Sequence, residues 1–329
     1  MFGSIKEILD KCESEGREFW RVILEDDMSD RNVDENESAQ KMRELWDAMY
    51  QAAKGYDGSI KSASGLSGGD GKKMEEYIKT HECLCGEFMG KVITEALKMG
   101  ESNACMKRIV AAPTAGACGV MPAILVPYYE RMILQNINVE DNAKNNITTD
   151  YGDNKSNNIT TDNAEQKDKD TKAKKEADEK IIKALYVAAG IGEVIARRAS
   201  ISGARGGCQA EIGSASAMAA GALTYLQGGN EQQIADSVAM ALKNLLGLVC
   251  DPVGGLVEYP CQNRNAAGVA NALVAAEMAL AGITQLIPLD EMITIMYTVG
   301  KKLPAELRET ALGGCATAPS ACEACHICN

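Results

Sequence analysis

The sequence has few aromatic residues and only two histidines. Aromatic side chains make up 5% of the 329 residues, and the histidines are His81 and His326. A zinc hydrolase that uses several histidine ligands is therefore not expected. The chain also has no GxxxxGK[ST] phosphate loop, no βαβ pattern around a GxGxxG sequence and no Ser-His-Asp arrangement, so the enzyme classes that these motifs indicate are not favoured either.

Basic clusters and a signal-peptide core are missing as well. The formal net charge is −12 and the isoelectric point is about 4.9, which argues against a nucleic-acid-binding protein. The first residues, MFGSIKEILDKCESEG, have no apolar signal core, so we expect a cytoplasmic protein. In that compartment the 12 cysteines are expected to be reduced thiols, some of them metal ligands, rather than disulfides.

Two uncharged runs, 109–129 and 212–230, are long enough to be considered as membrane spans. Glycines interrupt both runs, and Pro113, Pro122 and Pro127 interrupt the first. We therefore expect buried helices and loops, and no membrane partner.

Apolar residues recur mostly at helical spacing, and few runs alternate with period two. Ser4 and Glu7 have the spacing of a capping box at the start of a first helix. Further helices are expected at 231–247, 266–282 and 289–302. These patterns predict an all-α fold, a multi-helix catalytic domain with buried helices rich in small residues and with glycine-rich active-site loops.

Changes in composition divide the chain into three predicted parts: an N-terminal helical segment at 1–80, a catalytic domain at 81–315 and a cysteine-rich tail at 316–329. Within the domain, residues 138–180 contain the sequence NNITTD twice, followed by a highly charged stretch. Because this insertion has few large apolar groups to bury, we expect it to be disordered.

Three cysteines stand out because each lies in a Gly- or Pro-rich turn at the edge of an apolar helix: Cys208, Cys250 and Cys261. Three thiolates from separate loops fit an iron–sulfur cluster better than a zinc knuckle, which usually uses C-x-x-C pairs. Three protein ligands would also leave one iron open, where it can act as a Lewis acid. Cys83 and Cys85 are one residue apart, a poor spacing for binding the same metal.

Two other loops are candidate ligand-binding segments. In RIVAAPTAGACGVMPAIL (108–125), the turn at Thr114, Ala115 and Gly116 offers consecutive backbone N–H groups that can bind a carboxylate. The glycine-rich SASGLSGGDGKK (62–73) fits a loop near a small ligand. A kink between buried helices is the alternative for the first loop, and a linker is the alternative for the second.

Four segments in chain order resemble the α chain, or α domain, of the iron–sulfur-dependent L-serine dehydratases. They are APTAGACGVMPAIL, SISGARGGCQAEIGSASAMAAG, CDPVGGLVEYPCQNRNAAG and MYTVGKKLPAELRETALGG. The resemblance implies conversion of L-serine to pyruvate and ammonia without pyridoxal phosphate. It also implies a 4Fe-4S cluster on Cys208, Cys250 and Cys261, whose open iron binds the amino-acid substrate.

The resemblance also directs attention to residues that could position the substrate. Thr114 and the backbone of Ala115 and Gly116 are candidates for binding its carboxylate, and the hydroxyl-rich loop of Ser62, Ser64 and Ser67 is a second candidate. The sequence that follows Cys261 contains Asn263, Arg264 and Asn265, which could reach substrate or cluster sulfurs. An internal salt bridge is the alternative for Arg264.

The family has a β part with an S-H-T-x-G-P motif, which this sequence lacks. The resemblance therefore implies a lone α chain that needs a β subunit, and we leave the general base unassigned. Single-chain members end in a cysteine that folds back onto the open iron, and Cys328 is expected to do the same. The alternatives for the tail of Cys322, Cys325, His326 and Cys328 are a separate zinc site, a second cluster, or solvated thiols.

Three rival functions remain at this point. The same cluster could eliminate from L-cysteine or L-threonine, or the chain could be a non-catalytic iron–sulfur or zinc regulatory protein. A pyridoxal-phosphate dehydratase is the third, although no lysine lies in a convincing context for that cofactor.

Overall fold

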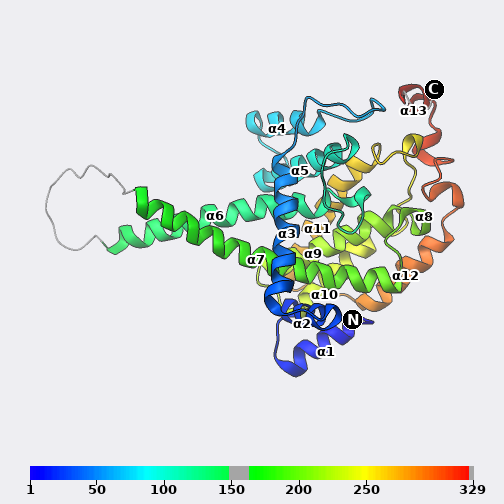
Figure 1. The fold of residues 1–329 in the computed structure, drawn as a ribbon. Helices are drawn as coiled ribbons and strands as arrows, with labels where there is room; N and C mark the ends of the chain where they lie inside the picture. Colours follow the sequence, from blue (N-terminus) through cyan, green and yellow to red (C-terminus); the bar gives the residue numbers. More distant parts are fainter. Residues whose placement is uncertain (148–162, 326–329) are drawn as a thin grey trace.

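A computed structural model describes residues 1–147 and 163–325 of the chain (Figure 1). This described part consists of α-helices joined by loops and short 3-10 or π-helical turns. Its only β pairing is an isolated parallel bridge between Cys250 and Arg308. The predicted all-α fold is therefore confirmed.

The N-terminal helices α1 (Ile5–Glu15), α2 (Phe19–Arg31) and α3 (Glu35–Lys54) lie together against the rest of the body (Figure 1). At the start of α1, the Ser4 hydroxyl accepts a hydrogen bond from the Glu7 N–H, which is one half of the predicted capping box; the Glu7 carboxylate accepts from the N–H of Gly3 instead of Ser4. The sequence analysis did not identify α2 as a separate helix, although its apolar face is buried. The boundary at residue 80 stays a prediction.

The core is built around α9 (Ser214–Leu226), which packs against α7 (Asn163–Arg198), α10 (Glu231–Asn244) and α11 (Cys261–Leu280). Small residues allow these helices to approach closely. A Cβ atom at Gly221 would lie only 2.3 Å from Cδ1 of Ile191, so a larger residue would push α9 and α7 apart.

The two long uncharged runs become buried parts of the body, as expected. The first supplies the start of α6 (Val120–Ile147), and the second supplies α9. Within the described residues, no helix has both the length and the apolar character needed to cross a bilayer. Pro127 does not interrupt α6, contrary to expectation, because the helix continues on both sides of it.

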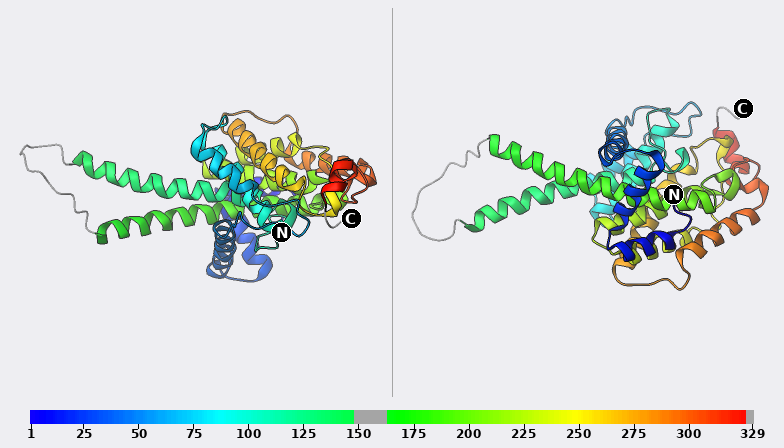
Figure 2. Two further views of the ribbon diagram at one scale, coloured as in Figure 1. Left: turned by 90° about the horizontal axis from the view of Figure 1, so that it is seen from above. Right: turned by 60° about the horizontal axis from the view of Figure 1, so that its bottom comes forward.

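Helices α6 and α7 extend side by side away from the body (Figures 1 and 2). The prediction of disorder throughout 138–180 is therefore wrong for 138–147 and 163–180, which are helical. The charged stretch is rich in Ala, Lys and Glu, which favour helix, and it continues directly into the apolar part of α7. Ala173 and Ala177 are already buried. Residues 148–162, which contain the second NNITTD sequence, lie outside the described residues.

The remaining helices cover the core and carry the loops of the candidate site. They are α4 (Asp70–Thr80), α5 (Gly86–Ala104), α8 (Gly203–Gly206), α12 (Leu289–Lys302) and α13 (Pro319–Ala324). The helices predicted at 231–247, 266–282 and 289–302 are confirmed as α10, α11 and α12, although α11 begins earlier, at Cys261. The loops beside α8 and α13 lie on the side of the body away from the α6–α7 hairpin (Figure 1).

Candidate metal centre and active site

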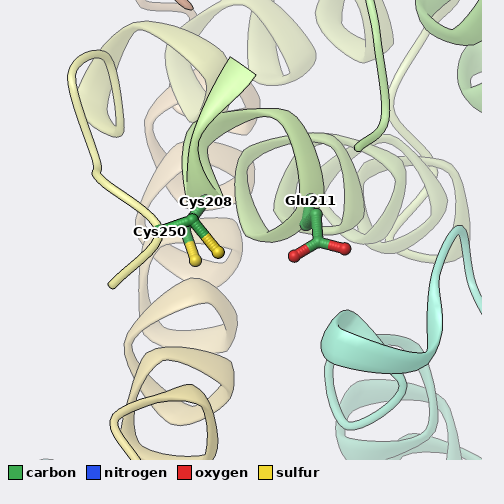
Figure 3. A group of neighbouring side chains, drawn as sticks. All are labelled: Cys208, Glu211 and Cys250. Atoms are coloured by element: carbon green, nitrogen blue, oxygen red, sulfur yellow. The ribbon is translucent and has the colours of Figure 1, made fainter. Parts of the chain in front are cut away.

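Cys208 and Cys250 lie beside each other although they belong to different loops. Figure 3 shows their sulfur atoms adjacent, on the side of the ribbon to which the carboxylate of Glu211 also points. The two sulfur atoms and one oxygen of Glu211 all lie within 4.8 Å of one another. In the described part of the chain, no other trio of Cys, His, Asp or Glu side chains meets this criterion, so these residues form the candidate metal centre.

Cys208 lies between α8 and a π-helical turn, Gln209–Gly213. Two side-chain hydrogen bonds hold Gln209 in place. Its Nε2 atom donates to the carbonyl of Met296 (2.9 Å), and its Oε1 atom accepts from the N–H of Gly247 (2.9 Å). Since π-helical turns occur frequently at functional sites, the local geometry agrees with a ligand position at Cys208.

Backbone hydrogen bonds fix Cys250 to a segment near the end of the chain. Its N–H donates to the carbonyl of Leu307 (2.9 Å), and its carbonyl accepts from the N–H of Glu309 (2.6 Å). Glu309 has a φ of +63°, a left-handed conformation that is uncommon for a residue other than glycine. Residues 307–309 therefore determine where the Cys250 thiol lies.

Cys261 is the first residue of α11 and is 7% exposed. It lies outside the group of Cys208, Glu211 and Cys250, but it is close enough for the charges of that group to act on it. Burial, followed by the charges of Cys208 and Glu211, raises the pKa of Cys261 to about 12. The Nδ2 atom of Asn265 donates to the carbonyls of Cys261 (2.8 Å) and Gly116 (2.8 Å), which ties the start of α11 to the turn at 114–116.

Three side chains of the candidate site lie close to the backbone of Gly203. A Cβ atom there would lie 2.8 Å from Sγ of Cys250, 3.0 Å from Oε2 of Glu211 and 3.1 Å from Oε2 of Glu309. Only glycine leaves room for these three groups to meet beside the backbone. A thiol and two carboxylates thus face the same small region from three separate segments.

The charges of the site favour a bound cation. Burial, reinforced by the charge of Glu309, raises the pKa of Glu211 to about 7. A hydrogen bond between the two thiols lowers the pKa of Cys208 and raises the pKa of Cys250. Because ionised thiols and carboxylates repel one another when buried together, a metal centre would relieve the repulsion, and the donor set fits a thiolate-bound metal group.

Arg264 lies directly beside this group. One guanidinium nitrogen is 2.7 Å from Oδ1 of Asp251, donates to the carbonyl of Val249 (2.8 Å) and lies 3.7 Å from Sγ of Cys208. The other oxygen of Asp251 accepts a hydrogen bond from the N–H of Cys315 (2.7 Å). Arg264 therefore makes an internal salt bridge and also reaches a thiol, which combines the two alternatives that the sequence left open.

The turn at Thr114, Ala115 and Gly116 also reaches the site. A Cβ atom at Gly116 would lie 3.2 Å from Oε2 of Glu211, so the turn faces that carboxyl group closely. The hydroxyl oxygen of Thr114 is buried beside Glu211 and has no hydrogen-bond partner of ordinary geometry. Ala115 is exposed to solvent. The turn thus places the hydroxyl of Thr114, which has no such partner, at the edge of the candidate metal centre.

The other predicted substrate residues lie in different settings. The hydroxyls of Ser62 and Ser64 are buried and donate to the carboxylate of Glu258 (2.6 and 2.7 Å), so they are already used within the protein. Asn263 is exposed on α11, whereas Asn265 is buried and makes the contacts described above. Substrate binding by these residues stays a prediction.

Part of the cysteine-rich tail is described. Cys315 lies in a 3-10 turn beside Asp251, the thiol of Cys322 donates to the carbonyl of Ala316 (3.6 Å), and Cys325 is fully buried after α13. Cys328 lies outside the described residues, as does the neighbouring histidine. The predicted folding of the tail onto the metal centre, and its alternatives, therefore stay predictions.

A cavity of about 690 Å³ lies elsewhere in the described part of the chain. It is lined by α4, α5 and α6, and none of the predicted site residues contributes to it. Several of its charged groups are paired with one another; Lys98, for example, forms salt bridges with Glu75 (2.9 Å) and Glu95 (3.1 Å). The size of this cavity therefore does not make it a better candidate for the active site than the group of Cys208, Glu211 and Cys250.

Comparison with known proteins identifies the family of this chain. The family described as "Serine dehydratase alpha chain" matches residues 14–147 and 166–316, which include all three turn cysteines. The chain belongs to this family. The resemblance inferred from the sequence motifs is thereby confirmed.

Individual relatives cover nearly the whole chain. It is 38% identical to a Bacillus subtilis protein named "Probable L-serine dehydratase, alpha chain", over 97% of this chain and 93% of the relative. It is 35% identical to the "L-serine dehydratase, alpha chain" of Peptoniphilus asaccharolyticus, over 96% and 94%. The "L-serine dehydratase" of Helicobacter pylori is 30% identical over 96% of this chain, which spans 61% of that longer protein.

Two residues of the candidate site were not identified from the sequence. Glu211 follows Cys208 by three residues, about one helical turn, and this spacing could have identified it. Glu309 had no comparable pattern, because its carboxylate reaches the site only through the backbone pairing with Cys250.

Proposed function

We propose that this chain is the α chain of an L-serine dehydratase that converts L-serine to pyruvate and ammonia together with a β chain. The names of the relatives support the activity. The observation that carries the proposal is the meeting of two buried thiols, Cys208 and Cys250, with Glu211 beside the turn at Thr114. Cys261, the first residue of α11, is close enough for the charges of Cys208 and Glu211 to raise its pKa.

The proposed cofactor is a 4Fe-4S cluster held by Cys208, Cys250 and Cys261. When bound, it supplies an open iron that acts as a Lewis acid toward the departing β-hydroxyl group. The three thiols come from three separate segments, and three protein ligands leave one corner of such a cluster open. The free space in front of Gly203 lets Cys250 and Glu211 approach it together.

The remaining residues of the site bind and orient the amino acid. The unpartnered hydroxyl of Thr114 and the backbone of Ala115 and Gly116 are proposed to bind the serine carboxylate. The carboxylates of Glu211 and Glu309 place negative charge where it attracts the α-ammonium group.

The reaction removes the Cα proton and the β-hydroxyl group, which leave together as water. The product is aminoacrylate, which tautomerises to an imine, and a water molecule hydrolyses the imine to pyruvate and ammonium. General-base help with the proton is typically worth about 10²–10⁴-fold. We assign the base to no residue of this chain.

A β chain is proposed to complete the site. Ala115 and Glu309 are exposed, so the region beside Glu211 is open on the side that they form. The Helicobacter pylori relative is long enough to carry a second part in the same polypeptide. In this proposal, the partner covers the open side and supplies the proton-transfer group.

Anaerobic purification of the chain with its β chain tests the proposal. Iron, sulfide and pyruvate formation from L-serine are measured for the wild type, Cys250→Ser and the control Cys12→Ser, which changes a buried thiol in α1. We expect Cys250→Ser to lose iron and activity and Cys12→Ser to keep both. Full iron content and turnover in Cys250→Ser would refute the assignment.

The same preparation decides between the rival functions. L-Threonine and L-cysteine are offered in place of L-serine, and faster turnover of either one would change the substrate assignment. A complex that holds iron but converts none of the three amino acids would instead be a binding or regulatory protein.

A further inference from the structure

The loop at 62–67 buries all three of its serines. Ser62, Ser64 and Ser67 are 6%, 0% and 2% exposed. A buried hydroxyl needs a hydrogen-bond partner, and a loop that offers three of them to a substrate would leave them unsatisfied in its absence. Here the partners come from the protein itself.

These partners lie on both sides of Cys261. The hydroxyls of Ser62 and Ser64 donate to Oε2 of Glu258, at 2.6 and 2.7 Å. The Nε2 atom of Gln262 donates to the hydroxyl of Ser67 at 2.6 Å. Glu258 precedes Cys261 by three residues and Gln262 follows it directly, so the loop holds the chain before and after this thiol.

The two hydrogen bonds from the serine hydroxyls to Glu258 are strong ones. Glu258 is 7% exposed, and no salt bridge to it exists among the described residues. Its buried carboxylate therefore depends on the two serine hydroxyls, and hydrogen bonds to an ionised acceptor are roughly twice as strong as neutral ones. On the other side, a Cβ atom at Gly100 would lie 2.9 Å from Cγ of Gln262, so α5 fixes that side chain as well.

The loop is itself rigid. The N–H of Ser67 donates to the hydroxyl of Ser62 (3.1 Å), and the N–H of Leu66 donates to the hydroxyl of Ser64 (3.1 Å). Each of these two hydroxyls thus accepts a bond from its own loop and donates one to Glu258. The loop keeps its shape while it fixes the carboxylate.

We propose that Ser62, Ser64 and Ser67 are positioning residues that fix the Cys261 thiol through Glu258 and Gln262, and that they do not bind substrate. This replaces the expectation that the loop binds the substrate carboxylate. The positioning proposal rests on the proposed function only for the identity of the group that Cys261 binds, because the contacts of the serines with Glu258 and Gln262 involve no ligand.

Thiol alkylation of the metal-free full-length chain tests the positioning directly. Iodoacetamide modification of Cys261 and of Cys118, which is buried elsewhere, is followed by mass spectrometry in the same sample. The variants are Ser64→Ala and Glu258→Gln. Ser59→Ala is the matched control, because Ser59 bonds the exposed Asp57 and makes no bond to the Cys261 loop.

We expect the ratio of Cys261 to Cys118 modification to rise about tenfold in Ser64→Ala and Glu258→Gln, and to stay unchanged in Ser59→Ala. In the iron-loaded complex, a chelator should remove iron faster from both variants, while the KM for L-serine of the loaded fraction stays at the wild-type value. The double variant should show no more than the effect of Glu258→Gln alone, since both changes break the same contact.

The opposite pattern overturns the proposal. If the KM rises strongly while Cys261 alkylation and iron retention keep their wild-type values, the serines bind substrate. If Ser64→Ala exposes Cys118 as well, Ser67→Ala serves as the second variant, because it removes only the bond from Gln262. An unchanged ratio of Cys261 to Cys118 modification in Ser67→Ala overturns the proposal. If the ratio of Cys261 to Cys118 modification rises but the chain never converts serine, the proposed function is refuted and the positioning role is not.

Discussion

Arg264 and Asp251 form an ion pair of 2.7 Å beside the thiol of Cys208. Both side chains are shielded from solvent, with 15% and 4% of their surfaces exposed. The pair also holds the carbonyl of Val249 and the N–H of Cys315. Groups that orient a metal ligand from behind typically determine how tightly the metal is held.

Replacing Arg264 should therefore weaken the metal centre without unfolding the chain. Lysine keeps the charge, but it has no planar fork to reach Asp251, Val249 and Cys208 together. We expect Arg264→Lys to lower iron retention against a chelator by about 10–100-fold. Arg31→Lys, which changes an exposed ion pair with Asp27, is the control, and equal iron retention in the two variants would contradict the prediction.

Glu211 should make the stability of the metal-free chain depend on pH. Its pKa is raised from 4.5 to about 7, so the folded chain binds this proton more tightly than the unfolded chain. The resulting stabilisation is full below about pH 4.5 and is lost as the pH rises through about 7. Across that window, the unfolding free energy of the wild type should fall by about 2–3 kcal/mol more than that of Glu211→Gln.

Urea unfolding of the metal-free wild type and Glu211→Gln at pH 5 and pH 8 measures this contribution. The difference in unfolding free energy between the two proteins should favour the variant more at pH 8 than at pH 5. A difference that does not change with pH would show that Glu211 has an ordinary pKa.

Adding a methyl group at Gly203 should disturb the site more than the fold. The new Cβ atom would lie 2.8 Å from Sγ of Cys250, and Glu211 would also have to move. We expect Gly203→Ala to lose most of its bound iron while its helical circular dichroism stays unchanged. Gly213→Ala is the matched control, because a Cβ there meets no atom closer than 3.9 Å. Normal iron content in Gly203→Ala would show that the space is not needed.

Asp251 should hold the beginning of the cysteine-rich tail in place. Asp251→Asn weakens both the ion pair with Arg264 and the bond from the Cys315 N–H. We expect amide hydrogen exchange at Cys315 to become about tenfold faster in the variant. Asp57→Asn, a change in an exposed turn, should leave this exchange rate as it is in the wild type.

Much of the fold could be predicted because it depends on local patterns. Helices α10, α11 and α12 follow from apolar residues at helical spacing, and the three cysteines proposed as ligands stand out because each lies in a Gly- or Pro-rich turn. The charged stretch at 163–180 was misjudged, because its composition resembles that of disordered chains while its helix formers extend a helix that is already anchored in the core.

The parts that were missed depend on contacts between distant segments. Nothing near Glu309 in the sequence shows that its N–H bonds the carbonyl of Cys250. Likewise, a glycine-rich loop with hydroxyls fits a ligand site and a structural support equally well, and only the carboxylate of Glu258 distinguishes the two for Ser62 and Ser64. Residue types indicated the chemistry, whereas tertiary pairing determines which groups are free to perform it.

The pairing of Cys250 with Leu307 and Glu309 also has a consequence during synthesis. In a nascent polypeptide, this thiol cannot take its final place until residues 307–309 have emerged from the ribosome. A chain that stops before residue 307 would lack the segment with which Cys250 pairs, so it could not hold this thiol in its place.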